Sequence, residues 1–192
     1  MTVRTRKPSH SHPLLRWLPP LMMLCFFAVG SPGCGGLPVG TERGIKSGAT
    51  VQAYRLDPTA PRGSPTDPQT LDGYKVVAGP VQLSPDAASR LTTVLTDRYT
   101  YKTSPFKAGC PFQPLVGFRY PGNPHPVDVI VAFPCKEVRF VRWTLDGSRP
   151  DDKDEDVSGG NYVLVNVAKE AFPTDAAVQA LDPGKPGGRW EK

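Results

Sequence analysis

Two cysteines, Cys110 and Cys135, are the residues of this 192-residue chain whose type and position most clearly imply chemistry. They flank two apolar segments, 115–120 and 127–133, which the turn-forming sequence 121–126 connects. If the segments pair as a hairpin, a symmetric turn gives paired residue numbers that sum to about 245–247. A sum of 245 places Cys110 opposite Cys135, and directly opposed residues lie close enough for a disulfide.

The same sum of 245 predicts three further pairs, Phe118 with Val127, Val116 with Val129, and Phe112 with Phe133. Prolines at 111, 114 and 134 disturb strict pairing. The sequence leaves three alternatives to the disulfide open: a redox-active pair, a metal site that includes His125, and two free thiols. A redox pair usually has Cys-x-x-Cys spacing, and a metal site needs more ligands than these, so the disulfide is preferred.

Acid–base chemistry has little support in the sequence. His125 is the one histidine after the leader described below, and it lies in a proline-bracketed turn without a nucleophile motif beside it. The acidic run 151–156 lacks the glycine and terminal glutamate of an EF-hand loop, so we expect a solvated loop there. The open alternative is a hydrolase that uses carboxylates in a groove, with these candidates: Asp86, Asp97 and Asp128.

Ligand binding is also weakly indicated. No glycine-rich phosphate loop follows a strand, so the sequence predicts no nucleotide, cofactor or metal. Five aromatic residues could line a groove, although aromatic residues in a domain of this size more often pack in the core. They are Tyr99, Tyr101, Phe106, Tyr120 and Trp143.

The first 34 residues indicate export. A basic start without acidic residues precedes an apolar run over 21–29 and then small residues, which is the layout of a signal peptide over 1–33. The run is too short to span a bilayer. Ser31-Pro32-Gly33-Cys34 resembles a bacterial lipobox, in which the cysteine is lipidated (palmitate among its acyl chains) and becomes the new N-terminus. Cys34 is therefore the predicted lipid anchor.

The predicted location is the periplasmic side of a membrane, as a lipoprotein. Gly35 stands where Asp is the usual cue for inner-membrane retention, which favours the outer membrane. The leader holds four of the 23 basic residues and none of the 18 acidic ones, so the mature chain is almost neutral. A basic patch is the minimum footprint of a nucleic-acid binder, and we therefore expect no nucleic-acid partner.

Beyond Cys34 the chain divides into a tether and one domain. Residues 34–48 are glycine-rich and predict a flexible tether, and residues 49–192 are long enough for a single domain. Prolines mark 57–68 as a long surface loop. Strands are expected over 50–56, over 74–83 with a break at Gly79-Pro80, over 115–120 and 127–133, and over 137–145.

The best helix signal covers 85–98. Ser84 is a suitable N-cap, Pro85 fits the first helical position, and apolar residues recur at spacings of three and four. That stripe should cover the face of Val116, Phe118, Val127, Val129 and Val131. Residues 162–172 combine a strand-like with a helix-like pattern, followed by a short C-terminal helical segment. Grouped strands with separate helices predict an α+β fold with a small antiparallel sheet.

The stretch 74–181 resembles a set of uncharacterised secreted proteins and lipoproteins of planctomycetes, myxobacteria and similar bacteria. The resemblance rests on Leu83-Ser84-Pro85, on Asp97-Arg98-Tyr99-Thr100-Tyr101, on the cysteine-flanked segments 110–120 and 127–135, and on the tail 168–175. It implies an α+β domain, favours a helix over 162–172, and implies no known activity. The expected function is a non-catalytic binding or scaffold module of the cell envelope. A protease inhibitor that presents its proline-rich loop is a further alternative.

Overall fold

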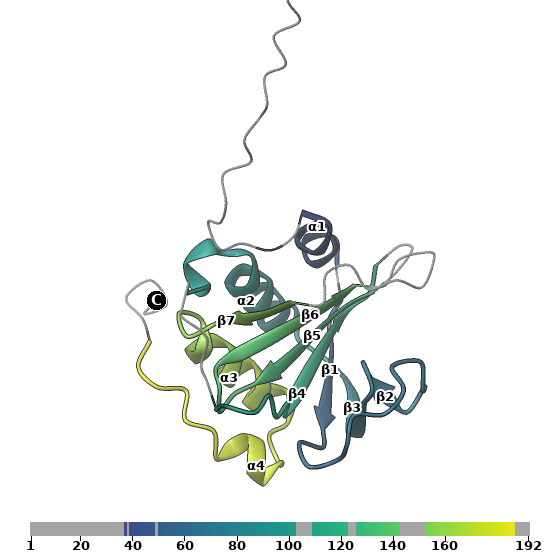
Figure 1. Ribbon diagram of the computed structural model, residues 1–192. Coiled ribbons are helices and arrows are strands. Elements are labelled where there is room, and N and C mark those ends of the chain that lie inside the picture. Colours follow the sequence, from purple (N-terminus) through teal and green to yellow (C-terminus); the bar gives the residue numbers. More distant parts are fainter. Residues whose placement is uncertain are drawn as a thin grey trace, which may run out of the picture. The chain divides into compact units, whose positions relative to one another are not determined.

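The computed structural model of the chain describes residues 37, 39–48, 50–102, 109–122, 126–142 and 153–186, all within one compact unit that spans 33–192 (Figure 1). These residues form an α+β domain with one antiparallel sheet, as the sequence predicts. Cys34 and His125, together with Phe106 and Trp143, lie outside the described residues.

Seven strands form the sheet within the described ranges, in the order β2-β3-β1-β4-β5-β6-β7. Each strand in this order runs antiparallel to its neighbours. The strands are β1 (Gln52–Leu56), β2 (Thr70–Leu71), β3 (Tyr74–Gln82), β4 (Val116–Tyr120), β5 (Val127–Ala132), β6 (Glu137–Arg142) and β7 (Lys153–Asp156).

The helices pack on one face of this sheet, which we call the helix-covered face. They are α1 (Val39–Ser47), α2 (Pro85–Thr96), the short 3-10 helix η1 (Arg98–Thr100), α3 (Asn161–Ala171) and α4 (Ala176–Gln179). Helix α2 begins as predicted, because the Ser84 hydroxyl accepts a hydrogen bond from the backbone N–H of Ala87 at 3.2 Å. The ambiguous stretch 162–172 is helical up to Ala171, the last residue of α3, where tertiary packing decides between two local patterns.

The main core lies between α2, α3 and the sheet. Leu91, Val94 and Leu95 of α2 are fully buried against the same cluster as Val116, Phe118 and Val129 of the sheet. The predicted contact between the helix stripe and this strand face is therefore confirmed. Fully burying one such apolar side chain stabilises the fold by about 1.5–3 kcal/mol.

The hairpin register lies at the upper end of the expected range, two residues from the register used to predict the individual pairs. The structure pairs Val116 with Val131, Phe118 with Val129 and Tyr120 with Val127, so paired numbers sum to 247 rather than 245. A shift of two keeps every side chain on its expected face, because the side-chain period of a strand is two. The predicted opposition of Phe112 and Phe133 as strand residues is wrong, since β4 begins at Val116 and residues 133–136 form the turn after β5.

The cysteines are nevertheless joined. Cys110 and Cys135 form a disulfide with a Cα–Cα distance of 5.8 Å. Cys135 lies in the β5–β6 turn and Cys110 precedes β4, so the bridge ties the segment 109–115 to that turn rather than joining two strands.

Two loop expectations need correction. Residues 39–47, expected within a flexible tether, form α1, because Thr41 and Ile45 are fully buried against the domain. Residues 153–156 of the acidic run, expected in a solvated loop, form the edge strand β7. There the cross-strand partner of Asp154 is Arg139, which offsets the low strand propensity of acidic residues.

Strand β3 also departs from its expectation, since it continues through Gly79-Pro80. That peptide bond is cis, and register shifts against β1 surround it. Strand β2 pairs only with Tyr74 and Lys75, so the remainder of β3 forms one border of the described sheet.

Candidate functional site on the outer face of the sheet

The face of the sheet opposite the helices, here called the outer face, carries arginines, aspartates and aromatic rings. Alternation along the strands places Arg119, Asp128 and Arg139 there, because each directly follows a residue of the main core. Segments 57–73 and 109–115 cover part of this face, over a small apolar cluster of Leu56, Leu71, Tyr74 and Ile130. Leu71 packs directly on β4, where a Cβ at Gly117 would come within 2.2 Å of its side chain, so a larger residue at 117 would force the Leu71 side chain to move.

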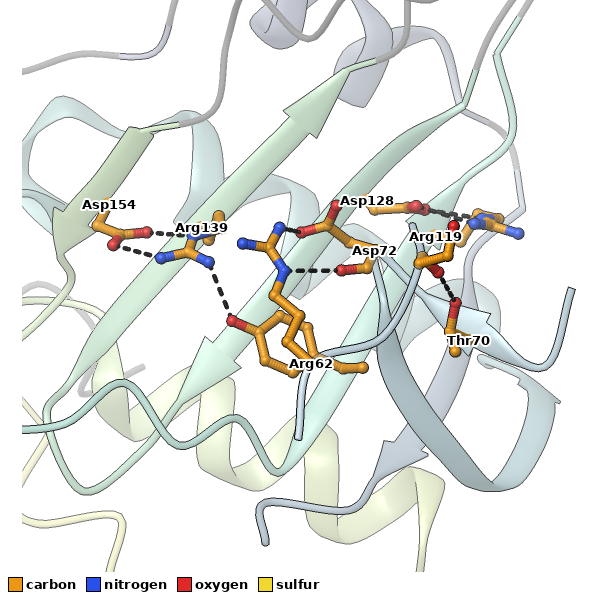
Figure 2. A network of polar contacts seen from close by, with 9 residues as sticks. Arg62, Thr70, Asp72, Arg119, Asp128, Arg139 and Asp154 are labelled. Atoms are coloured by element: carbon orange, nitrogen blue, oxygen red, sulfur yellow. Dashed lines mark hydrogen bonds and ion pairs between the residues drawn. The ribbon is translucent and has the colours of Figure 1, made fainter. Parts of the chain in front are cut away.

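Arg119 of β4 and Asp128 of β5 form the central ion pair. They are direct cross-strand partners, and two parallel bonds join them, Nε to Oδ1 at 2.7 Å and Nη2 to Oδ2 at 2.8 Å (Figure 2). The Asp128 side chain is fully buried, whereas Arg119 keeps 33% of its side chain exposed. The hydrogen bonds to Asp128 raise the pKa of Arg119 although burial opposes them, so the guanidinium stays charged.

Arg139 of β6 forms a second pair of the same kind. Its Nε and Nη2 donate to the two carboxylate oxygens of Asp154 at 2.7 and 2.8 Å, and its Nη1 donates to the hydroxyl of Tyr74 at 2.9 Å. Tyr74 belongs to β3, so one guanidinium connects strands that are far apart in the sheet order. Burial raises the pKa of the Tyr74 phenol, with Arg139 and Arg62 opposing the rise, and the hydroxyl remains protonated at neutral pH.

Arg62 brings the proline-rich loop into this layer. Its Nε donates to the backbone oxygen of Asp72 at 3.1 Å, and its Nη2 lies 2.5 Å from the carboxylate Oδ2 of the same residue (Figure 2). Asp72 has a positive φ of 53° in the turn before β3, and its side chain is fully buried. The cationic side chain of the loop therefore points inward at the sheet.

Each of these three guanidinium groups also lies over an aromatic ring. The distances from Cζ to the ring centroid are 4.5 Å for Arg139 and Phe112, 5.2 Å for Arg62 and Tyr74, and 5.7 Å for Arg119 and Tyr54. All lie within the range of a cation–π interaction. Phe112 sits two residues after Cys110, so the disulfide holds this ring against the sheet.

The carboxylates proposed for a hydrolase do not converge. Asp86 lies in the first turn of α2 and bonds Arg90 at 3.0 Å, Asp97 caps η1 by accepting from the N–H of Tyr99, and Asp128 lies buried beneath Arg119. Among the described residues no three His, Cys, Asp or Glu side chains could hold a metal ion together. The outer face thus offers charged donors and rings, with its aspartates engaged by arginine.

A second feature lies at the end of α2. Thr93, Thr96, Asp97, Arg98 and Tyr99 line a shallow, open depression. Tyr99 is 56% exposed, and Arg98 lies over its ring at 4.7 Å and bonds its hydroxyl at 2.7 Å. Of the aromatic residues that the sequence offers for a groove, Tyr101 and Tyr120 are buried in the core, so they do not line one.

The arginine pairs were not predicted from the sequence, although a signal for one of them was present. Arg119 and Asp128 are directly opposed only when paired numbers sum to 247, and opposite charges favour that alignment. The pairing of Arg139 with Asp154 had no comparable signal, because 153–156 does not look like a strand. The contacts of Arg62 depend on the path of a long loop.

Comparisons with known proteins give no relative from which to draw a function. The chain matches no protein-family model, and neither curated proteins nor solved structures provide a match. In the part of the chain that the structure describes, no helix is long and apolar enough to cross a membrane.

Proposed function

We propose that this protein is an exported, lipid-anchored protein of the cell envelope, and that it acts as a non-catalytic binding module through the outer face of its sheet. The proposed location rests on the signal-peptide layout and on Cys34, and Gly35 favours the outer membrane. The proposed partner is an envelope protein or an envelope ligand that recognises guanidinium groups and aromatic rings.

One observation carries the binding role, namely that three arginines on one sheet face are each held by an aspartate and each lie over a ring. Arginine and aromatic residues are enriched where protein interfaces gain most of their binding energy. A side chain that is already fixed loses little conformational freedom when a partner binds. The fixed guanidinium groups therefore suit recognition better than catalysis, because the aspartates that could act as bases are engaged.

Partial exposure keeps this layer accessible. Arg62 and Asp154 expose 36% and 41% of their side chains, and Tyr54 and Phe112 are partly exposed. The surface therefore combines a rigid base of buried carboxylates with donors and rings that a partner can reach.

Position-specific photo-crosslinking in the native envelope tests the binding role. A benzophenone amino acid in place of Tyr54 or Phe112 should give a discrete crosslinked product, because it lies on the outer face. The same group at Ala177, exposed on α4 on the helix side, should not give that product. Equal products from all three positions, or none from Tyr54 and Phe112, would contradict a docking role for this face.

Lipid attachment has its own test. Labelling with a radioactive fatty acid should mark the wild-type protein and should not mark a Cys34→Ala variant. Equal labelling of both proteins would refute the anchor, and it would leave the outer-face test unaffected.

A further inference from the structure

The folded domain begins much closer to Cys34 than a flexible tether would allow. Leu37 packs against the main core, and α1 starts at Val39. Thr41 and Ile45 of α1 are fully buried, so the helix is part of the domain rather than a spacer. As an extended chain, residues 34–48 could have reached about 50 Å. Most of this sequence is instead folded.

Covalent geometry limits the distance between the anchor and the domain. Three residue steps separate Cys34 from Leu37, and a chain rises at most about 3.3–3.6 Å per residue, so the two Cα atoms lie within about 11 Å in any conformation. The headgroup layer of a bilayer is about 5–7 Å thick on each side of its hydrocarbon core. A protein held by acyl chains at Cys34 therefore has the surface around Leu37 at the headgroups.

Helix α1 and the corner formed by the end of α2 and η1 provide that surface. Helices α1 and α2 are in contact. Tyr101 lies just beyond η1, and burial is the main cause of its raised pKa, followed by Glu155 and Tyr120. Glu42, in the first turn of α1, is close enough to add a smaller contribution to this raised pKa. In Figure 1, α1 and this corner lie at the same end of the domain, away from α4. Helix α1 leads into the start of β1, whereas Asp175, the N-cap of α4, bonds Arg55 near the end of β1.

The exposed side chains at this end suit a phospholipid surface. Arg43 on α1 is exposed, as are Arg98 and Tyr99 at the corner. Lys46 on α1 is also exposed, and it pairs with Glu42 at 2.5 Å. Tyrosine concentrates at membrane–water interfaces because its ring is apolar and its hydroxyl is polar, and basic residues near a membrane attract anionic lipids. The Arg98 guanidinium over the Tyr99 ring places a cation beside the exposed aromatic.

We propose that this end of the domain rests on the phospholipid headgroups of the membrane that holds the anchor, with Tyr99 and Arg98 in the headgroup layer. The proposal rests on the lipid anchor of the proposed function. It fixes the orientation of the domain, because the short link and the interfacial side chains act at the same end. A protein partner or a second copy at this corner is the rival occupant.

Fluorescence quenching by labelled lipids tests the orientation in the full lipidated protein. Tyr99→Cys and the control Ala177→Cys each give one free thiol, because Cys34 carries lipid and Cys110 and Cys135 are bonded. Each variant is labelled with an environment-sensitive dye and reconstituted into vesicles of phosphatidylethanolamine and phosphatidylglycerol. Headgroup-nitroxide lipids should remove most of the fluorescence at position 99 and little at position 177.

Flotation with the vesicles separates the two proposals. Protein that does not float with the vesicles contradicts the lipid anchor and therefore the proposed membrane location. Protein that floats but shows equal quenching at positions 99 and 177 overturns the orientation alone. The emission of the dye at position 99 is also compared between vesicles with and without nitroxide lipid. An equal loss in both means that a protein contact, and not the headgroup nitroxide, quenches the dye, which also overturns the proposal.

A longer link tests whether reach sets the orientation. A flexible Gly-Ser spacer of about 20 residues inserted between Gly36 and Leu37 spans an average of about 25 Å. It should release the corner and reduce the quenching at position 99 while flotation is unchanged. Undiminished quenching with the spacer would overturn the role assigned to the short link.

Discussion

The two faces of the sheet bury different kinds of side chain, although the same strands build both. Within β5, Val127, Val129 and Val131 contact the helices, while Asp128 and Ile130 point to the outer face, and all five are buried. The helix-covered face gains its stability from apolar area. The outer face instead buries carboxylates, each matched to an arginine from a neighbouring element.

This difference separates stability from the proposed recognition. A buried ion pair contributes little net stability compared with apolar packing, yet breaking it by removing one partner is costly. We infer that the helix-covered face holds the domain together and that the outer face fixes the geometry of a surface. The variants below test this division.

The largest loss of stability is expected from a cavity in the helix-covered face. Phe118→Ala should lower the free energy of unfolding by about 3–5 kcal/mol, because it removes a fully buried ring from the main core. Phe112→Ala, which removes a partly exposed ring from the outer face, should cost about half as much. Urea denaturation of both variants measures the ratio, and equal losses would remove the distinction between the faces.

Removal of the disulfide should cause the next largest loss of stability, and it should loosen the outer face. Reduction of the Cys110–Cys135 bridge opens a link across a sequence separation of 25, which is worth about 3 kcal/mol in the chain-entropy model. The melting temperature should fall by very roughly 5–15 °C. Cys110→Ala should have the same effect and leave one reactive thiol at position 135.

Thiol titration provides the control for that prediction. The unreduced, unfolded mature protein should show no reactive thiol at position 110 or 135. Two reactive thiols would contradict the bridge and would weaken the argument for an oxidising compartment.

The ion pair of the outer face should respond asymmetrically to its two single substitutions. Arg119→Ala should cost about 2–3 kcal/mol, because it leaves the fully buried carboxylate of Asp128 unmatched. Asp128→Ala should cost about 1 kcal/mol less, because Arg119 already reaches water. The double variant Arg119→Ala/Asp128→Ala should cost clearly less than the sum of the two single losses, and a fully additive result in urea denaturation would contradict the coupling.

The smallest effect concerns high pH and the two buried tyrosines of the main core. Burial raises the pKa of Tyr120 and Tyr101 in the main core, so these phenols stay protonated when folded while they ionise near pH 10 when unfolded. The unfolded state then binds fewer protons, and stability should fall by about 1.4 kcal/mol per pH unit and per tyrosine above pH 10. Tyr120→Phe should flatten this decline in urea denaturation, and an unchanged slope would contradict the assignment.

Local patterns predicted most of the helix-covered face. The Ser84-Pro85 start and the stripe of α2, together with the alternation of β4 and β5, define both partners of that core from the amino-acid sequence alone. These signals are local, because they depend on periods of 3.6 and two. The disulfide was predicted correctly although its strand register was not, because the two cysteines flank the ends of the same hairpin and so lie close together in either register.

The outer face was harder to predict because its partners come from distant segments. Arg139 of β6 meets Tyr74 of β3 across 65 residues of sequence. The identity of 153–156 as a strand depends on Arg139 rather than on its own composition. Helix α1 was missed for a similar reason, since Thr41 and Ile45 become buried only when the domain supplies the surface they cover.

The edge strands of the described sheet affect whether two molecules of this protein can pair edge to edge when they are crowded together. An open strand edge pairs readily with the edge of another copy, unless it is interrupted or charged. Strand β3 contains Pro80, which has no N–H to donate, and β7 carries Asp154, Glu155 and Asp156 in succession. Acidic side chains disfavour the pairing of two such edges, and an edge that lacks one N–H cannot form a continuous hydrogen-bond ladder. If the proposed anchor confines the molecules to two dimensions, where neighbours collide frequently, they can therefore remain separate folded domains rather than merge their sheets.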